Sequence, residues 1–261
     1  MSQIWEPEKL VRQGYKINVR KIKDVRDIIA HSPDFQKLKL ADEDFLYTGA
    51  EHIGKPKFQN ITLLPNVGST QDYIVYGSTF GHQHLRQPGD NRPFQELYEF
   101  QNYGAMLLRS PDRTQLVLAR PGEKVFVKTT EDMTLFNLGR EPLITLDYAN
   151  PEKNHATKEL EKRFGPLMIV TKEKGVLRFG INPAYREEEL ISGEKEEVLV
   201  PEQKTEEDLF KYIEGLKKEF NSCGIGLIFG GNIPQCLKQD LSEPLVDLVN
   251  KRNRTLMDLL K

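Results

Sequence analysis

Short apolar runs, rich in β-branched and aromatic residues, dominate the hydrophobic pattern between residues 58 and 150. In chain order they are NITLLP, DYIVYGSTF, QELYEF, GAMLLRS, TQLVLARPG, KVFVKTT, MTLFNLG and PLITLDY, with Gly, Pro, Asn and Asp between them. Each run has the residue types of a strand, and turn residues separate it from the next. Many short strands with frequent turns indicate a mainly β sandwich or barrel. The later segment MIVTKEKGVLRF predicts one further hairpin.

Helical spacing of apolar residues is found near the two ends of the chain. Near the start, the residues with this spacing are Ile22, Val25, Ile28 and Ile29. Further on, Thr205 and Asp208 resemble a capping box. The apolar face that follows consists of Leu209, Ile213, Leu216 and Phe220. A last helix is expected after Ser242, with an apolar stripe of Leu245, Leu248, Val249, Leu256 and Leu259.

The charged segment REEELISGEKEEVLVPEQKTEED, residues 186–208, lies between the β-rich part and the C-terminal helical stretches. Its charge density and its proline fit a linker between two units, and they fit a solvated loop within one domain equally well. On the first interpretation the chain has a barrel domain, residues 1–190, and an α-rich C-terminal extension of unknown role, residues 191–261. The same pattern predicts a short helical region before the barrel.

Composition and charge narrow the classes of partner. The 261 residues include 37 basic and 39 acidic side chains, which gives a net charge of −2. Nucleic-acid binding requires an excess of Lys and Arg on one face, so we expect no nucleic-acid partner. Cys223 and Cys236 form no CxxC pair, which is typical of reduced thiols in a cytosolic protein. No segment looks like a signal peptide or a membrane span, so the expected location is the cytoplasm.

One short segment combines residues that carry chemistry. His82 and His84 alternate on one predicted strand, and Glu96 and Tyr98 alternate on the next. Because residues i and i+2 of a strand share a face, pairing of these strands would bring two imidazoles and a carboxylate together. That set is the 2-His-1-carboxylate site that suits Fe(II) and related divalent ions. Gly81 allows close backbone approach or a bulge there. The alternative is a pair of histidines on a solvated strand face.

The motifs around these residues resemble a known family. The segments TFGHQH (79–84), ELY (96–98) and GAMLL (104–108), followed by Pro121 and Gly122, are similar to those of the archaeal-type, cupin-fold glucose-6-phosphate isomerases. The resemblance covers about residues 15 to 188. It implies a cupin barrel, which is a double-stranded β-helix or jelly roll, and it implies a homodimer. The implied reaction interconverts glucose 6-phosphate and fructose 6-phosphate.

The resemblance also implies roles for individual residues. His82, His84 and Glu96 would hold a divalent metal, which could be Fe, Mn, Ni or Zn. Thr79 and Gly81 match residues that bind the phosphate end of the sugar. Further positions of the family site are matched by Tyr98, Tyr148 and His155. The two tyrosines would position the open-chain sugar, and His155 would lie near the phosphate or assist ring opening. An exposed loop histidine is the alternative for His155.

Two departures from the family pattern leave alternatives open. The fourth metal ligand of the family is a histidine, and the corresponding position here is Met133, whose thioether is a poor ligand for such ions. The loop between His84 and Glu96 is also longer, and we interpret it as either a lid or an inert insertion. If Met133 abolishes metal binding, a cis-enediol route with Glu96 as the base is expected; otherwise a metal-assisted hydride shift is equally compatible.

Two other functions remain open on the sequence alone. The chain could be a non-catalytic cupin that binds a sugar phosphate, or an isomerase relative with a shifted substrate. A weaker hypothesis is a structural or regulatory protein in which the C-terminal helices carry the function. Those helices are also compatible with simple packing onto the barrel of the same chain.

Overall fold

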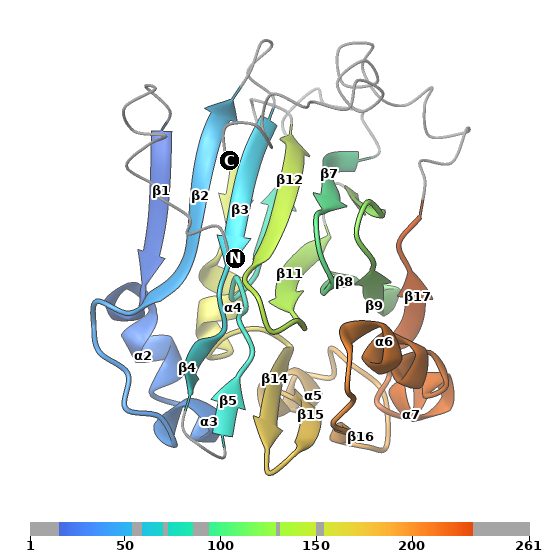
Figure 1. Cartoon of the computed structure of the whole chain (residues 1–261). Helices are drawn as coiled ribbons and strands as arrows, with labels where there is room; N and C mark the ends of the chain where they lie inside the picture. The colour runs from blue at the N-terminus through green and yellow to red at the C-terminus, as the bar shows by residue number, and fades with distance from the viewer. Residues whose placement is uncertain are drawn as a thin grey trace.

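The computed structural model describes residues 16–53, 59–69, 73–85, 94–128, 131–149 and 154–231. In these residues the strands form three sheets (Figure 1). The first sheet has the order β1-β2-β3-β12-β7-β10. Its strands are β1 (Lys16–Lys21), β2 (Phe45–Ile53), β3 (Gln59–Leu64), β12 (Leu143–Ala149), β7 (Phe94–Phe100) and β10 (Lys124–Lys128).

The second sheet has the order β13-β6-β11-β8-β9-β17, and the third has the order β16-β15-β14-β5-β4. The strands of the second sheet are β13 (Asn154–Ala156), β6 (His82–Leu85), β11 (Asp132–Asn137), β8 (Gly104–Ser110), β9 (Arg113–Ala119) and β17 (Gly226–Phe229). The strands of the third are β16 (Glu197–Pro201), β15 (Val176–Ile181), β14 (Met168–Glu173), β5 (Tyr73–Val75) and β4 (Val67–Ser69).

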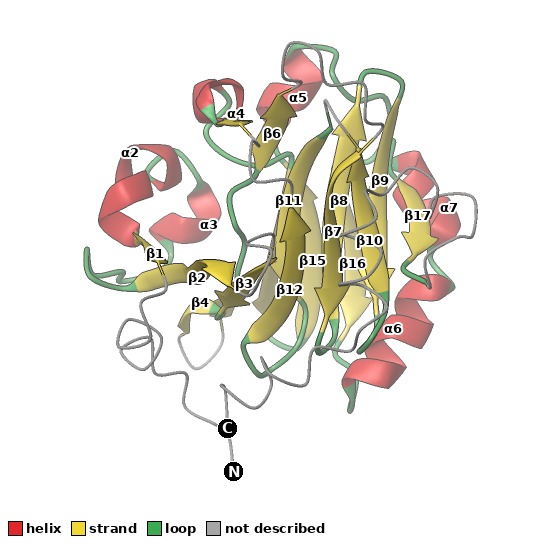
Figure 2. Ribbon diagram, turned by 90° about the horizontal axis from the view of Figure 1, so that it is seen from above, coloured by secondary structure: helices red, strands yellow, loops and turns green. Residues whose placement is uncertain are grey.

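Eight of these strands form a jelly roll. The half-barrels are β3-β12-β7-β10 in the first sheet and β6-β11-β8-β9 in the second. From β6 to β12 the chain crosses to the opposite sheet at every step except the β8–β9 hairpin, which is the interlocked connectivity of a jelly roll. Figure 2 shows the sheets stacked face to face. The mainly β, cupin-type barrel predicted from the sequence is therefore confirmed.

The barrel interior is filled by apolar side chains from both sheets. Val125 and Val127 alternate inward on β10 and pack with Met106 and Leu108 from β8 and with Leu135 from β11. This is the period-two burial expected of strands that cover a core with one face. Since each buried side chain of this size contributes about 1.5–3 kcal/mol of transfer free energy, the facing sheets are held together chiefly by this layer.

A larger core lies on the outer face of the second sheet. There Leu107 and Leu116 from β8 and β9 pack with Phe179 from β15 and with Phe210 and Phe220 from the C-terminal helices. These helices are α6 (Glu206–Glu214) and α7 (Lys217–Ser222). Shorter helical turns are η1 (Ile22–Val25), α2 (Arg26–Ile29), α3 (Pro33–Gln36), α4 (Lys158–Lys162) and α5 (Pro183–Glu187). Figure 2 shows α6 and α7 at one side of the stacked sheets and α2 and α3 at the other.

The predicted helix start after residue 204 is confirmed. The Thr205 side chain accepts a hydrogen bond from the Asp208 N–H at 3.1 Å and donates one to the Asp208 carboxylate at 2.8 Å. The apolar stretch behind it forms two helices, because α6 ends at Glu214 and is followed by Gly215, the poorest helix former after proline. The expected last helix, residues 242–259, lies outside the described residues.

Strands on both sides of residue 190 pair with each other. Strand β16 is hydrogen-bonded to β15, and β17 runs parallel to β9 at the edge of the barrel sheet. The described part of the expected C-terminal extension therefore contains two strands as well as α6 and α7. The division after residue 190 stays a prediction. Within the described ranges, no helix is both long and apolar enough to cross a membrane.

Candidate active site in the barrel

Three of the predicted site residues converge inside the barrel. Glu96 lies on β7, and its side chain is completely buried. The Tyr98 hydroxyl, two residues further along the same face, donates a hydrogen bond to Glu96 Oε2 at 2.6 Å. His82 enters from β6, with its Nε2 4.0 Å from the same carboxylate oxygen. A carboxylate, a phenol and an imidazole therefore meet at one point.

The strands that carry these residues do not pair with each other, which corrects the expectation from the sequence. Strand β6 pairs with β11 and β13, whereas β7 pairs with β12 and β10. His82 and Glu96 consequently approach from opposite walls of the barrel. The physical reason is the jelly-roll connection, in which the segment after β6 crosses to the other sheet. Of the loop between His84 and Glu96, interpreted as either a lid or an inert insertion, residues 86–93 lie outside the described residues.

For His84, Tyr148 and His155 the structure describes the backbone alone. His155 lies on β13 as the register partner of His84, so it belongs to a strand and not to a loop. Tyr148 lies on β12 opposite Leu97. The backbone thus places His84 on the same strand as His82, His155 on the strand next to it, and Tyr148 on the strand next to that of Glu96. Their predicted roles as ligand, sugar contact and catalytic group stay predictions.

Met133 occupies the strand position beside His82. It is paired with His82 on one side and with Leu108 on the other, and only 1% of it is exposed. Its side chain belongs to the apolar cluster of the barrel interior. Among the described side chains, no group of three or more His, Cys, Asp and Glu residues is arranged to hold a metal ion. The described donors are therefore one imidazole and one carboxylate.

Thr79 and Gly81 form the approach to His82. Thr79 exchanges hydrogen bonds with Leu135 of β11, since its N–H donates to the Leu135 carbonyl at 3.2 Å and its hydroxyl accepts from the Leu135 N–H at 3.1 Å. Gly81 has a φ of +79°, and an added Cβ would lie 2.5 Å from both Leu160 Cδ2 and Thr134 Oγ1. Only glycine combines that backbone angle with such close packing. The glycine in the predicted motif thus has a structural reason.

A small cavity lies beside these residues. It has a volume of about 90 Å³ and is lined by Thr79, Gly81 and His82 together with Arg20, Tyr47 and Thr157, among others. Arg20 is a cation on β1, and Tyr47 lies on β2, so the first sheet extends the site beyond the jelly roll. Sequence reasoning missed both. The alternation in KINVRK predicts a strand, but nothing in the sequence links that strand to the barrel mouth.

A second buried carboxylate lies behind Tyr98. Asp147 is the register partner of Tyr98 and accepts hydrogen bonds from the Thr62 and Thr145 hydroxyls, both at 2.7 Å. Burial, and then the charges of Glu96 and Asp147, raise the pKa of Tyr98 well above its usual value. The phenol therefore stays protonated and acts as a hydrogen-bond donor to Glu96. The polar pair at positions 145 and 147 of an otherwise apolar strand was the available sequence signal for Asp147.

Comparison with known proteins finds only distant likenesses. No protein-family model and no curated protein matches the chain. Among solved structures, the chain is similar to the cupin domain of Drosophila melanogaster CENP-C, with 8% identity over 43% of this chain and 74% of that one and a TM-score of 0.30. It is similar to Bacillus subtilis oxalate decarboxylase, with 13% identity over 42% and 26% and a TM-score of 0.31.

A third similar structure is the polyketide cyclase RemF of Streptomyces resistomycificus. It is 22% identical over 41% of this chain and 66% of that one, with a TM-score of 0.26. Likenesses at this level carry no information about chemistry. The cupin-type barrel is established by the strand order, and the similarity to glucose-6-phosphate isomerases stays an interpretation of the sequence motifs.

Proposed function

We propose that the chain is an aldose–ketose isomerase that interconverts glucose 6-phosphate and fructose 6-phosphate, with Glu96 as the base. One observation supports this more than any other. A fully buried carboxylate is held by the Tyr98 hydroxyl at 2.6 Å and lies 4.0 Å from the His82 imidazole. A carboxylate fixed in this way, next to donors for developing negative charge, suits proton abstraction beside a carbonyl.

The proton transfers follow from this arrangement. Glu96 takes the proton from C2 of the open-chain aldose while His82 gives a proton to the C1 oxygen, which leaves a cis-enediol. Return of the proton from Glu96 to C1, as the C2 hydroxyl gives its proton back to His82, completes the ketose. Because both carbons are neighbours, one carboxylate can serve them in turn. Tyr98 orients the carboxylate, and His82 lies where it can donate to an oxygen of the enediol.

The phosphate end of the sugar has a matching place. Thr79 and Gly81 line the cavity beside His82, and the cation of Arg20 borders the same cavity. A hydroxyl, a backbone N–H and a guanidinium are suitable partners for phosphate oxygens. His82 lies between this cavity and Glu96, because it lines the cavity and its Nε2 is 4.0 Å from Glu96 Oε2. Binding of the phosphate there would place the carbonyl end of the sugar toward Glu96.

A divalent metal fits part of this site. His82, His84 and Glu96 would hold the ion, and a nitrogen and oxygen donor set suits Fe, Mn, Ni or Zn. When bound, the ion would polarise the carbonyl and hydroxyl oxygens of the sugar as a Lewis acid. Met133 offers only a thioether beside His82, so the ion would have fewer hard donors than a four-ligand site.

The test is an assay of fructose 6-phosphate formation from glucose 6-phosphate, run with chelator and with added Mn or Fe. Glu96→Gln should lower kcat by about 10²- to 10⁴-fold, the usual contribution of a general base. Glu131→Gln is the matched control, because Glu131 is also a buried glutamate but contacts Arg113 and the Lys128 N–H instead of the barrel site. Full activity of Glu96→Gln, with the control equally active, would refute the assignment.

A non-catalytic or substrate-shifted sugar-phosphate cupin is the second candidate. The observation that favours it is Met133, which puts an apolar side chain in the strand position beside His82. On this hypothesis the protein binds a sugar phosphate but does not interconvert glucose 6-phosphate and fructose 6-phosphate. Calorimetric binding with no turnover in the assay above would support it and exclude the isomerase.

A further inference from the structure

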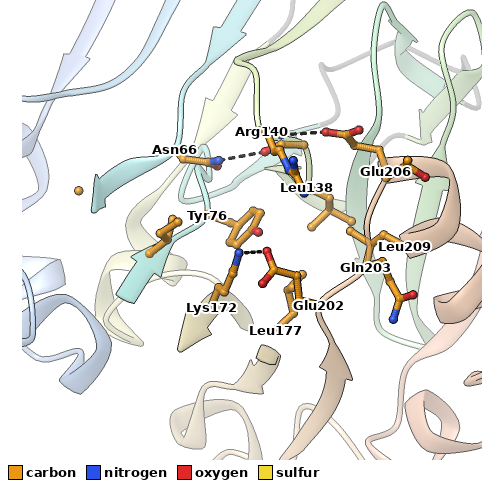
Figure 3. Close-up of a pocket in the computed structure, with 14 residues that line it drawn as sticks. Asn66, Tyr76, Leu138, Arg140, Lys172, Leu177, Glu202, Gln203, Glu206 and Leu209 are labelled. Atoms are coloured by element: carbon orange, nitrogen blue, oxygen red, sulfur yellow. Dashed lines mark hydrogen bonds and ion pairs between the residues drawn. The ribbon is translucent and has the colours of Figure 1, made fainter. Parts of the chain in front are cut away.

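A second, larger cavity lies outside the barrel, between the third sheet, α6 and the loop that follows β11 (Figure 3). Its volume is about 600 Å³, which is in the range of cavities that hold small organic molecules. The apolar part of its lining consists of Ile74, Leu138, Leu177 and Leu209. These side chains come from four separate elements, so the hollow is built by the tertiary fold.

Tyr76 lies among these residues and adds a hydroxyl group to the lining of the cavity. Only 8% of Tyr76 is exposed, and within the described ranges its hydroxyl has no hydrogen-bond partner. Burial, ahead of the charges around it, raises its pKa to about 12, so it stays a neutral hydroxyl that can donate and accept. Because Tyr76 lines the cavity, a molecule bound there can serve as the hydrogen-bond partner of this hydroxyl.

Two cations and two carboxylates, Arg140, Lys172, Glu202 and Glu206, line the same cavity as Tyr76. Lys172 forms an ion pair with Glu202. Arg140 donates from its guanidinium to the Lys204 carbonyl at 3.2 Å, and its backbone N–H donates to Glu206 Oε1 at 3.3 Å. The cavity rim is therefore balanced in charge, with both signs present above an apolar floor. A ligand with a single charge would be attracted by the rim side chains of opposite charge and repelled by those of the same charge.

We propose that this cavity binds a small zwitterion with an apolar body, of which leucine and phenylalanine are the simplest examples. The ligand carboxylate contacts Arg140 and accepts a hydrogen bond from the Tyr76 hydroxyl. The ammonium group lies against the carboxylate of Glu206. The apolar side chain fills the floor between β15 and α6. The inference does not depend on the isomerase proposal, because no residue of the barrel site takes part.

The test is calorimetric titration of the full chain with L-leucine and L-phenylalanine. At least one should bind, and 4-methylpentanoate and 3-methylbutylamine, which each lack one charge of leucine, should bind at least about tenfold more weakly. Tyr76→Phe should weaken amino-acid binding about tenfold, because a hydrogen bond to a charged group is lost. Tyr212→Phe is the matched control, since Tyr212 is an exposed tyrosine on α6 that does not line the cavity.

Several outcomes would overturn the proposal. One is the absence of binding of either amino acid to the folded wild-type chain up to about 10 mM. Another is equal binding of 4-methylpentanoate and leucine, which would indicate a simple anion site. Unchanged affinity in Tyr76→Phe would place the ligand elsewhere. Because the Tyr76 hydroxyl has no partner in the described residues, this variant keeps the packing of the ring, and its thermal stability gives an independent check of folding.

Discussion

Replacement of Gly81 by alanine tests whether the approach to the barrel site is fixed by close packing. Two costs add at this position. The first is the backbone angle, because a φ of +79° is unfavourable for a residue with a Cβ by about 1–2 kcal/mol. The second is steric, since the new Cβ would lie 2.5 Å from Leu160 Cδ2 and Thr134 Oγ1 and 3.0 Å from the Met133 carbonyl oxygen.

The steric cost comes from two kinds of contact. The Leu160 and Thr134 atoms are side-chain ends that can rotate, but the Met133 carbonyl belongs to β11 and is tied into the sheet. Overpacking of this kind usually costs about 1–3 kcal/mol. The total expected loss of unfolding free energy is therefore about 2–5 kcal/mol. Since Met133 neighbours His82, the displacement should also lower the activity of the barrel site.

Gly122→Ala is the matched control. Gly122 has a φ of +84°, almost the same angle, but no atom lies within 4 Å of the added Cβ. It should lose only the backbone cost of about 1–2 kcal/mol. Urea denaturation of both variants measures the difference, which isolates the close approach at Gly81. Equal losses in the two variants would refute the tight packing between residue 81, β11 and α4.

Three further predictions concern stability. Tyr98→Phe removes a hydrogen bond to a buried carboxylate and should lower the free energy of unfolding by about 1.5–3 kcal/mol. Tyr185→Phe loses only a hydrogen bond to a backbone carbonyl at 3.2 Å and should cost about 1 kcal/mol. Equal losses of the two variants in urea denaturation would contradict a charged hydrogen bond between Tyr98 and Glu96. Thr205→Ala removes the N-terminal cap of α6 and should lower the free energy of unfolding by about 1 kcal/mol. Ser32→Ala should be neutral or stabilising, because the Ser32 hydroxyl is buried without a partner among the described residues. A decrease in Tm for Ser32→Ala as large as that for Thr205→Ala would contradict this prediction. Burial raises the folded-state pKa of Tyr76 and Tyr98. The stability contributed by these tyrosines should therefore be constant below pH 10 and fall as the pH rises from the unfolded value near 10 through the folded pKa, which is about 12 for Tyr76. Tyrosinate absorbance that appears near pH 10 before unfolding and is missing in Tyr76→Phe or Tyr98→Phe would exclude this.

Most strands of the barrel could be predicted from the sequence, and their partners could not. Runs such as TQLVLA and KVFVK carry the alternation that follows from one buried face, and that signal is local. The partner of a strand depends on contacts far along the chain, so the pairing of β6 with β11 and β13 had no local signal. The expectation that His82 and Glu96 would meet was correct, although the reason was wrong, because they meet across the barrel and not across a hairpin.

The site residues show the same limit. The motif segments identified His82, Glu96 and Tyr98, which the structure brings together. Arg20 and Asp147 were missed because each belongs to a strand whose place at the site is set by the sheet order. The interpretations of His84, Tyr148 and His155, the metal and the homodimer remain predictions.

The parallel strand β17 has a consequence for how the chain is made. Residues 113–119, which form β9, are translated roughly 110 residues before residues 226–229, the segment that covers the edge of β9. At typical elongation rates of about 5–20 residues per second, that edge stays uncovered on the ribosome for several seconds. The backbone groups of an uncovered strand edge can pair with strands of other chains. Nascent chains of this protein should therefore depend on chaperone protection during that interval.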